Sequence, residues 1–134
     1  MIKLTIPGNP AAKGRPRVCK WGTYTPEKTV NYETLIKELF IISKQEKMEG
    51  ALRLEVLAHF PVTKSTSKKN RKKMLDGEIR PTKKPDWDNI GKICSDALNG
   101  LAYDDDSQIV LAVVGKWYSE EPHVQIIISK ETEV

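Results

Sequence analysis

The stretch PDWDNIGKICSDALNGLAYDDDSQIVLAVV, residues 85–114, decides the fold, because it reads as a helix, a turn, an acidic loop and a strand in direct succession. Apolar residues recur at helical spacing and predict a helix that begins at about Asn89 and buries one face (Ile90, Ile93, Cys94, Ala97, Leu98 and Leu101). Asn99 and Gly100 provide its C-terminal stop. The acidic loop then leads into residues 109–119, whose β-branched side chains predict a strand.

The flanking sequence supplies three further strands and a second helix. Residues 1–6 and 51–60 alternate apolar and polar side chains, and residues 123–129 form a last strand. Thr25 and Pro26 predict the start of a helix that runs to about Met48, with the threonine as N-cap. The elements predict one small domain of the α+β class (mixed α/β) over residues 1–134. A mixed β-sheet of about four strands packs against two main helices.

Composition excludes several classes of protein. Hydrophobic residues make up 39% and charged residues 30% of the 134 residues, which is typical of a globular domain. No apolar run could cross a membrane, and the N-terminus lacks a signal-peptide pattern, so we expect a cytoplasmic protein. Two cysteines are too few for a disulfide framework, and no Cys or His spacing typical of a zinc site occurs.

Positive charge is concentrated in two places. Residues 64–84 carry a net charge of +7, against +4 for the whole chain, and the loop KGRPRVCK covers residues 13–20. Such segregation favours a polyanion partner, and a solvated helix face is the alternative. The first segment holds so few apolar residues that we expect it to be mobile, whether or not it is helical. The predicted DNA-binding residues are Lys13, Arg15, Arg17, Lys68, Lys69, Arg71, Lys72, Lys73, Arg80, Lys83 and Lys84.

Two aspartates stand at the start of the central helix. Asp88 suits an N-cap, and that role alone would explain it. Asp86 lies two residues earlier, and residues two apart in an extended segment point the same way, so the two carboxylates are expected to aim at a common point. Converging carboxylates repel each other unless a cation lies between them. Lys92 and Asp96 share a helix face with Asp88, for which surface ion pairs are the alternative interpretation.

Further acids follow in the loop YDDDSQ, residues 103–108, although spacing does not show whether this loop returns beside Asp86. Oxygen ligands without histidine or cysteine suit Mg²⁺ or Mn²⁺, bound together with water and a substrate phosphate. Beside basic sequence, this pattern favours metal-assisted hydrolysis of a phosphodiester, in which a lysine offsets charge in the transition state. The alternative is an inert nucleic-acid-binding module whose acids cap and solvate helix ends.

Three segments carry a family resemblance: KGRPR (13–17), YTPEKTVNYE (24–33) and residues 77–110. They resemble the RusA family of Holliday-junction resolvases, the crossover junction endodeoxyribonucleases, which are found largely in bacteria, prophages and phages. The resemblance implies a RusA-like fold and a Mg²⁺-dependent endodeoxyribonuclease of DNA recombination and repair. It also implies a homodimer that nicks two opposing strands of a four-way junction symmetrically. A two-fold assembly matches the two-fold symmetry of such a junction.

Carried over by position, the resemblance makes Asp86, Asp88 and Asp106 the metal-binding catalytic acids and Lys92 the catalytic lysine. Asp105 also matches an acid of the family, whereas Asp104 is an addition. We expect Asp105 and Asp96 to lie next to the metal ligands and to help position them without binding the ion themselves. Within the enzyme class, a nuclease that prefers other branched DNA, such as flaps or forks, is the alternative.

Overall fold

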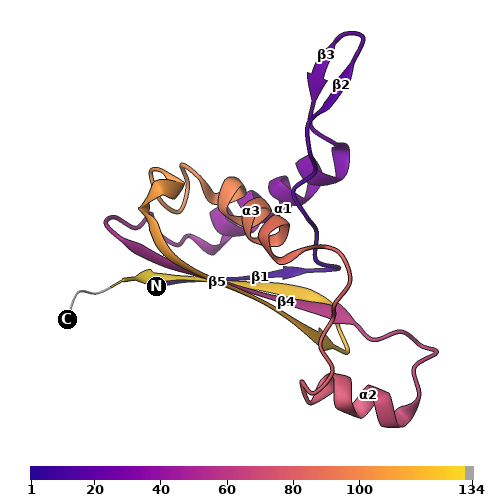
Figure 1. Ribbon diagram of the computed structural model, residues 1–134. Helices are drawn as coiled ribbons and strands as arrows, with labels where there is room; N and C mark the ends of the chain where they lie inside the picture. The colour runs from indigo at the N-terminus through magenta and orange to yellow at the C-terminus, as the bar shows by residue number, and fades with distance from the viewer. Residues whose placement is uncertain (132–134) are drawn as a thin grey trace.

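The computed structural model describes residues 1–131, and its centre is a four-stranded mixed sheet in the order β1-β6-β4-β5 (Figure 1). The strands are β1 (Ile2–Pro7), β4 (Leu52–Pro61), β5 (Ile109–Ser119) and β6 (His123–Lys130). Strand β6 runs antiparallel to both β1 and β4, whereas β4 and β5 are parallel. The predicted α+β class and the mixed sheet of four strands are confirmed.

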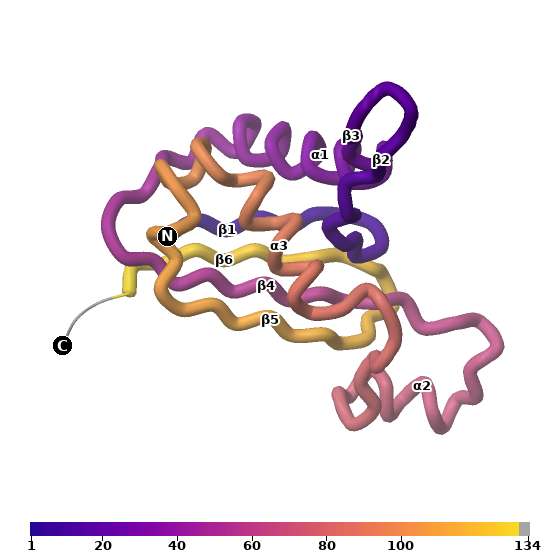
Figure 2. Tube along the Cα trace, turned by 45° about the horizontal axis from the view of Figure 1, so that its top comes forward, coloured from indigo at the N-terminus to yellow at the C-terminus, as the bar shows by residue number. Residues whose placement is uncertain are grey.

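Two helices, α1 (Glu27–Ser43) and α3 (Trp87–Leu98), lie on the same face of the sheet (Figure 2). The predicted stripe of α3 is buried from Ile90 to Leu98, and α1 contributes Ile36 and Phe40. From β4 the buried residues are Leu52, Leu54, Val56, Ala58 and Phe60, which alternate with partly exposed neighbours. The core therefore forms between this face of the sheet and the two helices, as the alternation of apolar residues predicts.

Both helices differ from the prediction at their ends. Helix α1 starts at Glu27 with Pro26 at the N-cap position, and it stops at Ser43 because Lys44 adopts a left-handed conformation with φ of 57°. The chain then leaves the helix, and the backbone N–H of Met48 donates a hydrogen bond to the carbonyl of Ala102. Helix α3 begins at Trp87 with Asp86 at the N-cap position. The predicted N-cap role of Asp88 is therefore wrong.

Two segments stand out from this body (Figure 1). One is a hairpin of β2 (Arg17–Cys19) and β3 (Gly22–Tyr24). The other carries α2 (Lys68–Leu75), whose first turn is capped by the Ser67 hydroxyl and which buries no residue. The basic segment is thus helical in part, and its mobility stays a prediction. Within residues 1–131, no helix is long and apolar enough to cross a membrane.

Candidate active site

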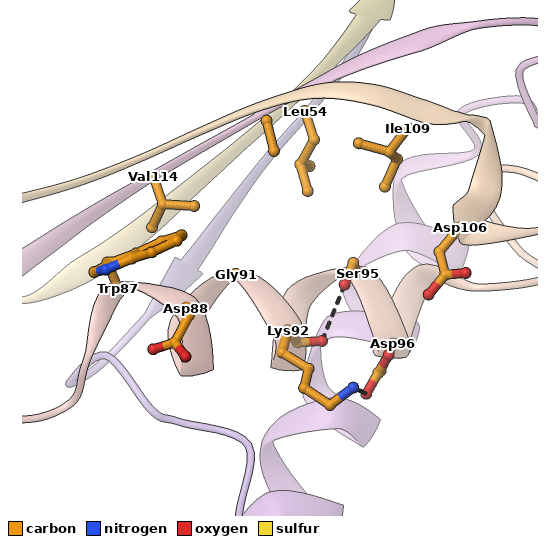
Figure 3. Close-up of a pocket in the computed structure, with 11 residues that line it drawn as sticks. Leu54, Trp87, Asp88, Gly91, Lys92, Ser95, Asp96, Asp106, Ile109 and Val114 are labelled. Carbon is orange, nitrogen blue, oxygen red and sulfur yellow. Dashed lines mark hydrogen bonds and ion pairs between the residues drawn. The ribbon is translucent and has the colours of Figure 1, made fainter.

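A pocket of about 310 Å³ lies between α3 and β5 (Figure 3). Its polar wall is formed by α3 and by the 3-10 turn η1 (Asp106–Gln108), and its floor by apolar side chains of β4 and β5. The polar lining residues are Asp88, Lys92, Ser95, Asp96 and Asp106. The shared helix face predicted for Asp88, Lys92 and Asp96 is therefore present, and Asp106 joins it from a different segment.

Gly91 explains how α3 can lie so close to the sheet. A Cβ atom at this position would stand 3.0 Å from a methyl carbon of Val114 on β5. A larger residue would force helix and strand apart, and the pocket between them would change shape. Glycine inside a helix lowers helix stability slightly, but at this position it permits the close approach to β5.

The loop that carries Asp106 is fastened to α3 by Tyr103. This side chain is fully buried, and its hydroxyl donates a 2.6 Å hydrogen bond to the backbone carbonyl of Ser95. The turn before it is closed by a hydrogen bond from Gly100 N–H to the carbonyl of Tyr103, with Gly100 at φ of 83°. The chain therefore reverses directly after the helix, which brings Asp106 back beside Asp96. Sequence spacing alone did not show this return.

The side chain of Gln108 holds the acidic loop from the other side. Its carbonyl oxygen accepts hydrogen bonds from the backbone N–H groups of Asp104 and Asp105, at 2.8 and 3.2 Å. Its amide nitrogen donates to the carbonyl of Gly50 at 3.1 Å. The loop is thus tied to the start of β4, although all three of its aspartates are exposed.

The three consecutive aspartates have three different environments. Asp104 forms an ion pair with Lys47 at 2.9 Å. Asp105 caps η1, because its carboxylate accepts a hydrogen bond from the backbone N–H of Ser107, and this bond lowers the pKa of Asp105. Asp106 lines the pocket. Only the last of the three therefore faces the residues of α3.

Asp86 is the predicted metal ligand that the pocket does not include. It lines a neighbouring hollow with Ala12, Lys84, Pro85 and Asn89. The expectation that Asp86 and Asp88 aim at a common point fails, because Asp88 already lies in the first turn of α3 and only Asp86 is in extended backbone. Within residues 1–131, no group of three or more Asp, Glu, His or Cys side chains is close enough together to hold a metal ion.

Two lysines neutralise one acid of the pocket. Asp96 forms ion pairs with Lys13 at 3.4 Å and with Lys92 at 3.8 Å, and Lys13 also pairs with Glu33 of α1. Burial lowers the pKa of Lys13, but the bonds to Glu33 and Asp96 raise it by more, so this lysine stays charged. Sequence reasoning assigned Lys13 to DNA and missed these contacts, since nothing in the spacing brings residues 13, 33 and 96 together.

The other two acids of the pocket, Asp88 and Asp106, have no basic side chain of the described residues beside them within ion-pair distance. Neither Asp88 nor Asp106 forms an ion pair with any residue in the described part of the chain. Mg²⁺ is commonly bound through one or two carboxylates together with water and substrate phosphate. The donor set of Asp88 and Asp106 fits this requirement, whereas Asp96 is engaged with lysines.

Five of the nine basic residues of the 64–84 segment fall into two groups. Lys68, Lys69 and Lys72 are exposed on α2. Arg71 instead pairs with Glu120 at 3.8 Å, and the Arg80 guanidinium lies 4.0 Å from the centre of the Trp117 ring. Arginine stacked on an aromatic ring is held in place. Arg71 and Arg80 therefore attach the segment to β5 and the turn after it, and the α2 lysines remain accessible.

Comparison with known proteins decides which family has this arrangement. The sequence matches the family described as Endodeoxyribonuclease RusA over residues 7–129. The chain belongs to the RusA endodeoxyribonuclease family. It is also 39% identical over 137 residues to "Uncharacterized protein YqaN" of Bacillus subtilis (strain 168), a match that covers 95% of this chain and 94% of YqaN. The RusA match includes the whole pocket and both basic segments, and it supports nuclease activity for this chain.

Proposed function

We propose that this RusA family member is a Mg²⁺-dependent endodeoxyribonuclease that resolves Holliday junctions by paired symmetric nicks in DNA recombination and repair. The observation that carries the proposal is the pocket in which Asp88 and Asp106, two carboxylates without an ion pair among residues 1–131, lie on one wall with Lys92. Exposed lysines on α2 and basic residues before β2 supply the charge that a DNA substrate requires. Since the substrate is intracellular DNA, the proposed compartment is the cytoplasm.

Asp86, Asp88 and Asp106 are the proposed ligands of Mg²⁺, for which Mn²⁺ can substitute. A bound Mg²⁺ would lower the pKa of a coordinated water and polarise the phosphoryl group. Asp88 and Asp106 stand at the two ends of the polar wall (Figure 3), so both border the space that an ion and a phosphate would occupy. Asp86 is exposed and makes no side-chain cap for α3, so its carboxylate is free to rotate when DNA and the ion bind.

Lys92 is the proposed catalytic lysine. Its side chain is 61% exposed, and its contact with Asp96 is a long one at 3.8 Å. Because Lys13 already neutralises Asp96, Lys92 can leave this carboxylate at little cost and approach a phosphate. There it would offset the negative charge that develops in the transition state. Asp96 and Asp105 thus have positioning roles. Asp96 holds Lys92, and Asp105 caps the turn that contains Asp106.

Paired nicks require two sites, and each chain has one. The proposed assembly is therefore a homodimer whose two-fold axis coincides with that of the four-way junction. The proposed phosphate contacts come from the basic segments (Arg15, Arg17, Lys68, Lys69, Lys72, Lys73, Lys83 and Lys84), whereas Lys13, Arg71 and Arg80, also predicted to bind DNA, are engaged with other side chains of the protein. Of these, Lys68, Lys69 and Lys72 are exposed together on α2.

The proposal is tested with purified protein and end-labelled synthetic DNA on denaturing gels. Four-way junctions of varied sequence should be nicked in two opposing strands when Mg²⁺ is present and not in EDTA, whereas linear duplex should stay intact. Preferential cutting of flaps or forks would favour the other branched substrates instead. Salt-dependent binding without any nicking, and without Mg²⁺-dependent stabilisation against heat, would identify an inert binding module.

A further inference from the structure

The β2–β3 hairpin exposes aromatic and aliphatic side chains to solvent. It projects away from the body beside the start of α1 (Figure 1). Trp21, at the tip, is 88% exposed, Val18 is 84% exposed and Tyr24 is 49% exposed. An isolated two-stranded hairpin is marginally stable, and exposed aromatic side chains do not help to hold it together. Trp21 therefore has no structural role in the isolated chain.

The root of this hairpin is fixed, in contrast to its tip. The backbone N–H of Lys13 donates to the carbonyl of Asn89, the residue after Asp88, at 3.1 Å. The next N–H, of Gly14, donates to the buried hydroxyl of Thr29 at 2.9 Å. A Cβ atom at Gly14 would stand 2.7 Å from that hydroxyl, so only glycine permits this approach. The hairpin is thus anchored to α1 and to the first turn of the helix that carries Asp88.

The charge of the hairpin shows which partner its tip fits. Residues 10–26 contain no acidic residue, and Arg15, Arg17 and Lys20 are all exposed. The Lys20 ammonium lies 5.6 Å from the centre of the Trp21 ring. An exposed indole flanked by cations complements a flat aromatic surface flanked by anions. An unstacked nucleic-acid base between two phosphates has this chemistry.

We propose that Trp21 stacks on an unstacked base at the branch point of the DNA substrate, while Arg15, Arg17 and Lys20 contact the flanking phosphates. This inference rests on the proposed function, and it assigns the recognition of branched over linear DNA to the hairpin tip. Linear duplex offers no accessible base face inside the helix, so Trp21 contributes nothing to duplex binding. The basic residues contribute to the binding of branched DNA and of linear duplex, because phosphates occur in both.

The test compares Trp21→Ala, Trp21→Phe and wild type for binding to a four-way junction and to linear duplex, in Ca²⁺ without Mg²⁺. Trp21→Ala should weaken junction binding by about 10- to 100-fold, the loss expected when a base–aromatic stack is removed. Duplex binding should change by less than about two-fold, since the indole meets no base there. Trp21→Phe should retain most of the junction affinity because its ring can still stack. The temperature of unfolding should be the same in all three proteins.

Several results would overturn the proposal. Unchanged junction binding by Trp21→Ala, or an equal loss on junction and duplex, would remove the stacking role. A change from dimer to monomer in sedimentation would show instead that the tip contacts a second copy of the chain. A 2-aminopurine placed at the branch point gives a direct signal, because stacking on Trp21 should quench its fluorescence and Trp21→Ala should restore it. A wild type that neither binds nor cuts any branched DNA would refute the proposed function itself.

Discussion

The Tyr103 hydroxyl and the Ser95 carbonyl are joined by a 2.6 Å hydrogen bond, and this contact fastens the acidic loop to the helix of Asp88 and Lys92. Burial raises the pKa of Tyr103, so its hydroxyl remains a donor at all physiological pH values. The position of Asp106 in the pocket depends on this buried side chain. The geometry of the candidate site is therefore set by a residue that does not line it.

Tyr103→Phe should lower the free energy of unfolding by about 1–2 kcal/mol, because the partly buried carbonyl of Ser95 loses its donor. Urea denaturation measures this change, and nicking of a junction should slow as Asp106 loses its fixed position. Tyr32→Phe is the matched control, since the buried Tyr32 hydroxyl has no hydrogen-bond partner within the described chain. Its removal should leave stability unchanged or raise it. Equal losses for both variants would contradict the role given to the Tyr103 hydroxyl.

Asp88→Asn should abolish nicking and keep junction binding. The substitution removes a proposed metal ligand but adds no repulsion toward DNA, so binding should persist. The nicking rate should fall by at least about 100-fold, because loss of a ligand should cost more than the loss of a residue that only hydrogen-bonds to a ligand. Gel-shift titration and single-turnover nicking measure the two properties separately. Normal cutting by this variant would show that Asp88 is not a metal ligand and only places a negative charge at the start of α3.

Lys13→Met should destabilise the protein by about 1–2 kcal/mol at neutral pH, because Glu33 and Asp96 lose a charged donor. Since the pKa of Lys13 is raised above its ordinary 10.5, the stabilisation is complete below that pH and disappears as pH rises through the folded-state pKa. The stability difference between wild type and variant should therefore be constant from pH 7 to 10 and then shrink. Lys20→Met, on the exposed hairpin, is the control and should change stability by less than about 0.5 kcal/mol.

Substitution of Lys68, Lys69 and Lys72 by alanine should weaken binding to junction and duplex alike. Each lysine that contacts a phosphate contributes about 0.9 to the slope of log affinity against log salt concentration, so the slope should fall by up to about 2.7. Lys3→Ala serves as control, because Lys3 is exposed on the far edge strand of the sheet. An unchanged slope for the triple variant would show that α2 does not meet the DNA.

Periodicity predicted the elements of this fold, because apolar side chains at spacings of two and of three to four mark buried faces directly. The ends of the helices were harder to predict. Thr25 and Pro26 are a standard start signal, yet the proline occupies the N-cap position, and Lys44 ends α1 through a left-handed backbone that its residue type does not signal.

The candidate site was predictable only within single segments. Helical spacing placed Asp88, Lys92 and Asp96 together, whereas the return of Asp106 depends on a turn closed by Gly100 and a tyrosine buried in the core. The separation of Asp86 from Asp88 follows from a helix that starts two residues earlier than expected. Such long-range contacts arise from packing, which spacing along one chain does not encode.

The comparison of Asp106→Asn with Asp104→Asn tests the central claim most directly. The two acids stand two residues apart in one exposed loop, but only Asp106 lines the pocket, whereas Asp104 pairs with Lys47. Single-turnover nicking of a four-way junction in Mg²⁺ should fall by at least about 100-fold for Asp106→Asn, as for a lost metal ligand, and by less than about two-fold for Asp104→Asn. Equal rates for the two variants, whether both are normal or both are lost, would contradict the assignment of this pocket as the nuclease site.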